Sequence, residues 1–278
     1  MRYVRPVWSD APAQIPGVWA VRVAVLLTVA VVTTYPLAVS QAVRVNAETG
    51  VRVYLPYAAR GPAAPPPAID EDYDTITIEG EPEARPAAEH PDLNLAVRGY
   101  EPVDAFRGLV DYGGAADPFA PQLVGLLGRA PEVRGTYQVH TWDWERTARG
   151  APITSPPVTF ITLGAGSNAI VRVPNSGRTI GDSYQVLVLY ADMERITLKY
   201  TREDNVVEGY TLHLEGVRVV PDLLTLYRQA DAAGRERLPA LRAGQAVGWA
   251  VGDAIGVAIR DQGSFLDPRS RKDWWRGY

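Results

Sequence analysis

Apolar and polar residues alternate through most of the C-terminal half of the chain. From residue 155 onward, short alternating stretches are separated by Gly, Asn and Pro, which is typical of β-strands joined by turns. The clearest stretches are VTFITL, AIVRV, YQVLVLY, RITLKYT, GYTLHLEGVRVV, QAVGWAV and AIGVAIRD. Many short strands predict a mainly β fold, with a sandwich or barrel-like domain over residues 151–278.

One segment within this β region has the spacing of a helix instead. PDLLTLYRQADAAGRERL begins with Pro221, a residue suited to the first position of a helix. Leu223, Leu224 and Tyr227 fall on one side of that helix and are expected to face the core.

Residues 92–150 predict a smaller α+β region. LNLAVRGY and TYQVHTWDW alternate as strands do. DPFAPQLVGLLG predicts a helix with Asp117 as N-cap and Pro118 at the first helical position.

The N-terminus has the features of an export signal. Arg2, Arg5 and Arg22 precede the apolar run VAVLLTVAVV, and small residues follow at SQA. The run is shorter than the roughly 20 apolar residues that span a bilayer. We expect residues 1–42 to be a cleaved signal peptide and the protein to be secreted or held at the cell surface, with an uncleaved anchor as the alternative.

Residues 43–91 predict a linker. GPAAPPPAIDEDYD combines prolines with an acidic run, a composition typical of an extended tether. Its carboxylates lack the spacing and the turn glycine of an EF-hand, so a solvated linker is favoured over a calcium site.

Composition excludes some classes of function. The formal net charge is −4, and the chain lacks the basic surface that binds nucleic-acid phosphates. Cysteine is absent, which excludes disulfides and cysteine-based zinc sites. No cofactor is expected, and a membrane is a partner only if the N-terminal segment stays uncleaved.

The stretch AIGVAIRDQGSFLDPRS resembles the closing strand and turn of the lysostaphin-like (LytM-type) zinc endopeptidases, which read roughly HLHFEVRxNGxxVDP. Arg260, Gly263, Asp267 and Pro268 occupy the matching positions. LRAGQAVGWA, EGYTLHLEG and IVRVPNSGRTI are similar to other strands and turns of that family, so the resemblance covers about residues 155–270. It implies a peptidase-like β scaffold.

The same resemblance implies that the zinc ligands are missing. Ala254 and Gly256 stand where the family has a histidine pair, and Gln229 stands near the place of a third histidine. PVTFITLGAG, where the first ligand pair is expected, contains no His, Asp or Glu. A catalytic zinc needs three protein ligands, so we expect no metal site and no peptidase activity.

Aromatic residues are the remaining candidates for binding. Strand alternation places His140, Trp142 and Trp144 on one face, where indole rings can stack on sugars, although two tryptophans at the edge of a core give the same pattern. Trp274 and Trp275 lie in a basic C-terminal segment that either closes the domain or contacts an anionic polymer.

Two classes of function follow from these patterns. The first is a non-catalytic secreted or surface module that binds cell-envelope glycan or an extracellular protein. The second is a cell-wall hydrolase whose catalytic residues have no recognisable motif. A scaffold alone does not decide between them, because function depends on the site that the scaffold carries.

Overall fold

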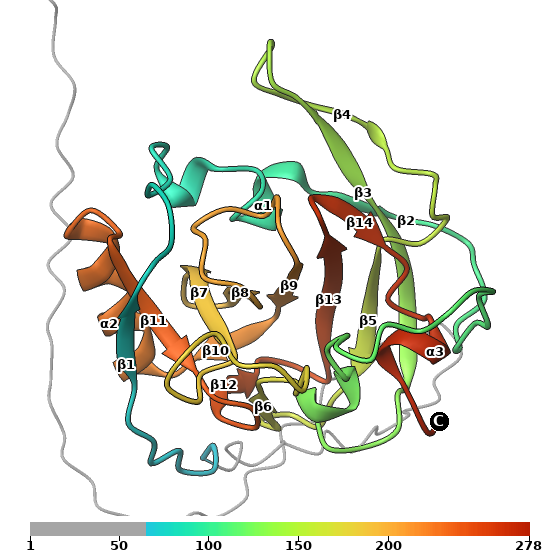
Figure 1. The fold of residues 1–278 in the computed structure, drawn as a ribbon. Helices are drawn as coiled ribbons and strands as arrows, with labels where there is room; N and C mark the ends of the chain where they lie inside the picture. Colours follow the sequence, from blue (N-terminus) through green and yellow to red (C-terminus); the bar gives the residue numbers. More distant parts are fainter. Residues whose placement is uncertain (1–64) are drawn as a thin grey trace, which may run out of the picture. The chain divides into compact units, whose positions relative to one another are not determined.

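Antiparallel strands dominate the computed structural model, which describes residues 65–278 (Figure 1). The prediction of a mainly β fold is therefore confirmed. The large sheet contains, in spatial order, β1 (Asp74–Thr77), β11 (Arg237–Leu241), β7 (Val186–Ala191), β8 (Arg195–Lys199), β9 (Tyr210–Glu215), β13 (Ala254–Asp261), β5 (Phe160–Gly164), β3 (Val133–Asp143) and β2 (Tyr100–Pro102).

Two further strands extend the large sheet. β14 (Ser264–Leu266) pairs with β13, and β4 (Ala148–Pro152) pairs with β3. A second sheet has the order β10 (Val217–Val219), β12 (Ala246–Ala250), β6 (Ile170–Arg172). The helical segments are short apart from α2: η1 (Ala87–Glu89), α1 (Leu95–Arg98), η2 (Leu123–Leu126), α2 (Pro221–Ala232) and α3 (Arg271–Trp274).

The helix expected after Pro221 is confirmed as α2. Pro221 is its first residue, and Leu223, Leu224 and Tyr227 are buried against the sheet. Figure 1 shows α2 beside β11, at one end of the sheet. The helix therefore covers apolar surface of β11 and β7.

The turn that the resemblance implies at Gly263 is present as a β-hairpin. Gln262 and Gly263 have φ values of 46° and 77°, and they connect Asp261 of β13 to Ser264 of β14. Two consecutive positive φ angles define the type I′ turn, whose twist matches that of a two-residue β-hairpin. Glycine suits the second position because it lacks a Cβ.

The helix predicted over DPFAPQLVGLLG is wrong. Asp117 accepts a hydrogen bond from the Phe119 backbone N–H at 2.8 Å, as a cap does, but the helix does not continue. Pro121 has no N–H to donate to a preceding carbonyl. The segment forms only the single 3-10 turn η2.

The acidic segment before residue 78 is not a free tether in the part of the chain that the structure describes. β1 pairs with β11 through four successive residue pairs. The Glu71 carboxylate accepts a hydrogen bond from the Ala246 backbone N–H at 2.9 Å, and the Trp249 indole donates to the Pro67 carbonyl at 2.8 Å. Residues 65–91 therefore belong to the folded unit. Residues 43–64 of the predicted linker, and the predicted signal peptide 1–42, lie outside the described residues.

The expected boundary near residue 150 does not separate two domains. The described residues 65–278 all belong to one compact unit. β3 lies in the first expected region and pairs directly with β5 in the second, from Val133 to Tyr137. The pairing explains the difference, because strands from both regions complete one sheet and share its core.

Within residues 65–278 the structure contains no helix that is both long and apolar enough to span a membrane.

Candidate functional site

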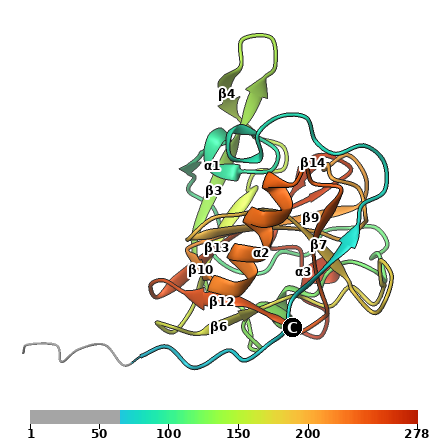
Figure 2. The ribbon, with the colours of Figure 1, turned by 90° about the vertical axis from the view of Figure 1, so that its left-hand side faces the viewer.

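Three of the five candidate residues lie on the hairpin formed by β3 and β4, which projects from the body of the protein (Figure 2). His140 pairs with Pro152 and Trp142 with Arg149, and the register shifts between these two pairs. Trp144 follows β3 directly. The structure therefore brings His140, Trp142 and Trp144 to one region of the surface.

Trp144 is the most exposed tryptophan of this group, with 43% of its surface accessible. Its ring is held by three neighbours. The ring centroids of Trp142 and His90 lie 6.5 and 5.6 Å away, and the Arg85 guanidinium lies 4.8 Å from the Trp144 ring. Because its neighbours restrict its rotamers, Trp144 can contact a ligand at a small cost in side-chain entropy.

Polar groups also lie on this hairpin. The Trp142 indole N–H has no hydrogen-bond partner within residues 65–278, although the atom is buried. A buried donor without a partner destabilises the protein by about 1–3 kcal/mol. Binding of a ligand is therefore favoured if a small movement of the hairpin lets an acceptor of the ligand reach this N–H. His140 Nδ1 lies 2.9 Å from the Gly150 carbonyl, and its Nε2 lies 3.7 Å from Glu101. The group thus combines apolar area with donors and acceptors.

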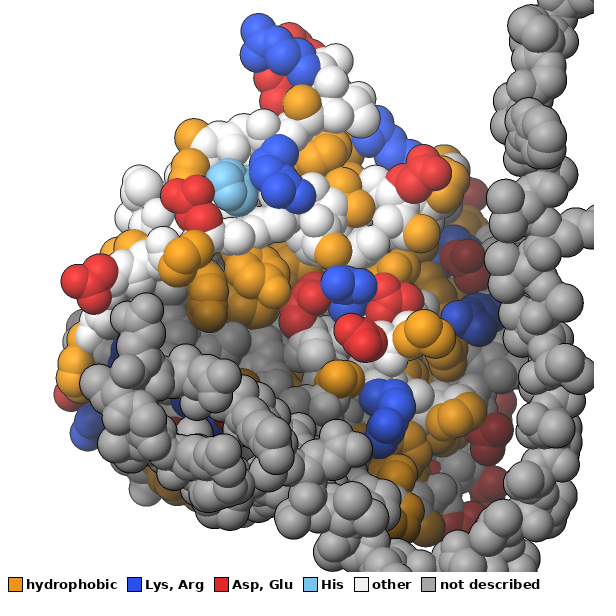
Figure 3. Space-filling view, turned by 180° about the vertical axis from the view of Figure 1, so that it is seen from behind, with side chains coloured by type: hydrophobic (Ala, Val, Ile, Leu, Met, Phe, Trp, Pro, Cys, Tyr) orange, Lys and Arg blue, Asp and Glu red, His pale blue; other side chains and the backbone are white. Residues whose placement is uncertain are grey.

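Figure 3 shows one face of the described surface, on which hydrophobic side chains gather and acidic and basic side chains border them. Figure 2 shows the tip of the hairpin extending beyond the body of the protein.

The two C-terminal tryptophans are core residues rather than a surface patch. Trp274 and Trp275 are 2% and 1% exposed. Their indole N–H groups donate to the carbonyls of Asp267 and Pro268 at 2.8 and 2.9 Å. The expectation that Trp275 contacts a ligand is therefore wrong, because its ring is packed within the hydrophobic core.

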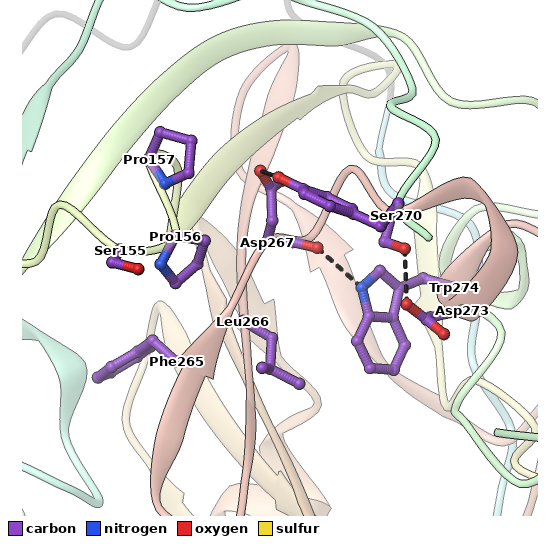
Figure 4. Close-up of a pocket in the computed structure, with 10 residues that line it drawn as sticks. Ser155, Pro156, Pro157, Phe265, Leu266, Asp267, Ser270, Asp273 and Trp274 are labelled. Carbon is purple, nitrogen blue, oxygen red and sulfur yellow. Dashed lines mark hydrogen bonds between the residues drawn. The ribbon is translucent and has the colours of Figure 1, made fainter. Parts of the chain in front are cut away.

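Trp274 borders a pocket of about 560 Å³ beside β14 (Figure 4). Phe265 and Leu266 of β14 form one side, and Pro156 and Pro157 form another. The volume lies within the range of small-ligand sites. Sequence patterns gave no sign of this pocket, because it lies between segments more than a hundred residues apart.

The polar groups of the pocket are already paired within the protein. The Asp267 carboxylate accepts hydrogen bonds from the Tyr112 hydroxyl at 2.7 Å and from the Arg269 side chain at 2.9 and 2.7 Å. The Ser270 hydroxyl donates to Asp273 at 2.6 Å. Burial, followed by the bond to Asp267, raises the pKa of Tyr112 to about 12, so its hydroxyl stays protonated near neutral pH.

The position of Gly256 has no room for a side chain. A Cβ there would lie 2.2 Å from Cζ of Phe160, whose ring is 1% exposed and stacks on Tyr100 at a centroid distance of 4.1 Å. The Phe160 ring thus fills the space next to Gly256. A histidine at this position would require the aromatic cluster to repack.

The histidines do not form a metal site. Among residues 65–278 no group of three or more His, Cys, Asp or Glu side chains is arranged to hold a metal ion. His90, His140 and His213 contact different partners: Glu83, Glu101 and Thr197.

His213 is buried as a neutral base. The Thr197 hydroxyl donates its single proton to the Leu93 carbonyl at 2.6 Å. His213 Nδ1 lies 3.0 Å from the same hydroxyl oxygen and must therefore donate to it. Nε2 is left as an acceptor without a partner in the described chain. Burial, with Arg260 nearby, lowers the pKa of His213 to about 3.

Glu215 is a titratable group that the sequence did not single out. It pairs with Gly256 across β9 and β13, and its carboxylate accepts a hydrogen bond from Arg195 at 2.7 Å. Arg195 also contacts Asp192 at 3.0 Å. Burial raises the pKa of Glu215 to about 7, since desolvation outweighs the attraction of Arg195. A carboxyl with a pKa near neutrality is suited to acid–base catalysis.

Comparisons with known proteins found no relative. No protein-family model matches the chain. No curated protein and no solved structure matches it either.

Proposed function

We propose that this protein is a non-catalytic binding module of the cell envelope that contacts glycan through Trp144 and the neighbouring residues of the β3–β4 hairpin. The observation that carries the proposal is the placement of Trp144, which is exposed on a projecting hairpin and held by Trp142, His90 and Arg85. An indole fixed in this way offers flat apolar area to a sugar ring.

The proposal includes a location outside the cytoplasm. The arginine-flanked apolar run and the small residues that follow it support export by a signal peptide over residues 1–42. A secreted or surface-attached protein meets envelope glycan, and the net charge of −4 does not favour a nucleic acid instead. A relationship to the lysostaphin-like peptidases as a degenerate member agrees with this location and remains part of the proposal.

Co-sedimentation of the full chain with purified peptidoglycan sacculi tests the proposal. We expect the wild type to sediment with the sacculi and Trp144→Ala to bind at least tenfold more weakly, a change of about 1.4 kcal/mol. Phe106→Ala is the matched control, because Phe106 is an exposed aromatic residue elsewhere, at 69% accessibility. Equal sedimentation of Trp144→Ala and wild type would refute the assignment of the site.

A protein partner is the alternative ligand within the same class of function. Glycan is preferred because a single ordered indole with adjacent polar groups matches one sugar ring, whereas stable protein interfaces bury about 800 Å² on each partner.

A hydrolase is the second candidate function, and Glu215 is the observation that favours it. A carboxyl with a pKa of about 7 beside the Arg195–Asp192 pair can exchange a proton near neutral pH. The test is the clearing of a peptidoglycan suspension by wild type and Glu215→Gln. If the wild type clears the suspension and Glu215→Gln does not, this alternative is established and the non-catalytic assignment is overturned.

A further inference from the structure

The β13–β14 hairpin leaves two backbone groups without a partner. Its type I′ turn makes Asp261 and Ser264 a hydrogen-bonded pair. Antiparallel pairs alternate, so Arg260 and Phe265 form a non-hydrogen-bonded pair. The N–H and C=O of Phe265 therefore both point away from β13.

No other strand occupies the outer side of β14. β14 pairs only with β13 in the described sheet. Within residues 65–278 no backbone or side-chain hydrogen bond from outside this hairpin reaches the N–H or C=O of Phe265. An open strand edge with unpaired groups is a template for another extended chain.

The free edge of β14 faces the pocket shown in Figure 4. The segment across the pocket carries Pro156 and Pro157, which have no backbone N–H. The Pro157 carbonyl accepts a hydrogen bond from the Gln138 side chain at 3.0 Å. The two prolines of the opposite wall therefore offer no N–H to the C=O of Phe265.

We propose that this pocket binds a short extended peptide segment, which adds to the edge of β14 through the N–H and C=O of Phe265. The arrangement selects a peptide over a sugar. One residue of an extended peptide presents a C=O and an N–H side by side, which is the pattern that these two groups require. The N–H and C=O of a single trans amide, such as a sugar acetamido group, point in opposite directions and satisfy only one of them.

The surroundings define the side chains that the peptide should carry. Pro156, Leu266 and Trp274 offer apolar contacts, and the nearby carboxylates of Asp267 and Asp273 are already paired within the protein. An uncharged peptide with small apolar side chains suits this pocket better than a charged one. The site is separate from Trp144, so it does not depend on the proposed glycan site.

Amide exchange measured by NMR on the full chain tests the inference, with the blocked peptide Ac-Ala-Val-Ala-Val-Ala-NH2 as the probe. We expect the Phe265 amide to exchange rapidly in the free protein and at least tenfold more slowly with saturating peptide. The same peptide N-methylated at its central alanine lacks one donor and should bind at least tenfold more weakly.

Two variants complete the test. Ser155→Trp places a ring over the pocket mouth and should abolish peptide binding, whereas Ser167→Trp, at an exposed turn away from the pocket, should retain it. Slow exchange of the Phe265 amide in the free protein, or equal binding of both peptides, would overturn the inference. So would binding of chitotriose in place of the peptide. Loss of sacculus binding in Trp144→Ala with peptide binding intact would leave the inference standing.

Discussion

Replacing Gly256 with alanine should destabilise the protein by a predictable amount. The new Cβ would lie 2.2 Å from Cζ of Phe160, 2.8 Å from its Cε2 and 3.0 Å from the Glu215 Cβ. To reach an ordinary contact of 3.4 Å, the Phe160 ring would have to move by about 1.2 Å. That ring is 1% exposed and packs on Tyr100 and Tyr137, so its movement disturbs the whole aromatic cluster.

The loss of stability in Gly256→Ala is the difference between two opposing contributions. Overpacking of a filled core costs about 1–3 kcal/mol. Replacing glycine with alanine also stabilises the folded state by about 0.4–1 kcal/mol, because alanine lowers the conformational entropy of the unfolded chain. The difference is a net loss of up to about 2.6 kcal/mol. It corresponds to a fall in Tm of up to about 10 °C for a domain of this size.

Thermal unfolding followed by circular dichroism measures this loss, with Gly252→Ala as the control. A Cβ at Gly252 meets nothing within 4 Å, so this variant should unfold at or slightly above the wild-type temperature. If Gly256→Ala is folded and as stable as Gly252→Ala, the account of Phe160 filling this position is refuted. Gly256→His should lose more stability than Gly256→Ala, because its imidazole must also be accommodated.

Two predictions concern pH. His213 has a pKa of about 3 in the folded state, below its usual 6.5, so its contribution to stability is complete above pH 6.5 and is lost as the pH falls towards 3. Denaturant unfolding should show that the free energy of unfolding falls by about 4–5 kcal/mol over this range, and His213→Gln should make that fall smaller. 15N NMR at pH 6 should show that the proton of His213 is on Nδ1. A proton on Nε2 instead would contradict the assigned hydrogen bond. The effect of pH on stability runs in the opposite direction for Glu215. Its folded pKa of about 7 lies above its usual 4.5, so the protein loses stability as the pH rises between these values. Glu215→Gln should therefore be more stable than wild type by up to about 3 kcal/mol at pH 8 and by very little at pH 4. A gain that does not change with pH would show that folding leaves the pKa of Glu215 unchanged.

Features set by local chemistry could be predicted from the sequence. Pro221 followed by apolar residues at helical spacing identifies α2. The resemblance to the closing strand and turn of the lysostaphin-like family places Gly263 in a turn, and the β13–β14 hairpin turns there. Both depend on interactions within about a dozen residues, which a single sequence displays.

Features set by distant partners could not be predicted. β1 follows an acidic, proline-rich segment, and it is a strand because β11, about 160 residues later, offers an edge to pair with. Trp275 lies in a basic segment that has the composition of a surface patch, yet it is buried because it packs into a hydrophobic core whose other members lie mostly far from it in the sequence. In both cases the partner, rather than the local composition, decides the structure.

The candidate site also combines features that the sequence indicates with features that depend on distant residues. The rings of Trp142 and Trp144, which strand alternation grouped with His140, lie 6.5 Å apart. The alternation gave no indication of Arg85 and His90, which come from a segment about 50 residues earlier. The pocket beside β14 and the raised pKa of Glu215 both depend on burial, which a single sequence does not specify.

The most direct test of glycan binding is an NMR titration that follows the indole N–H signals of the full chain with soluble peptidoglycan glycan fragments. We expect the signals of Trp144 and Trp142 to shift in a saturable way and those of Trp274 and Trp275 to stay in place. Trp144→Ala should remove the response. Saturable binding that leaves the Trp144 and Trp142 signals unchanged, or no binding at millimolar glycan, would contradict the proposed glycan site.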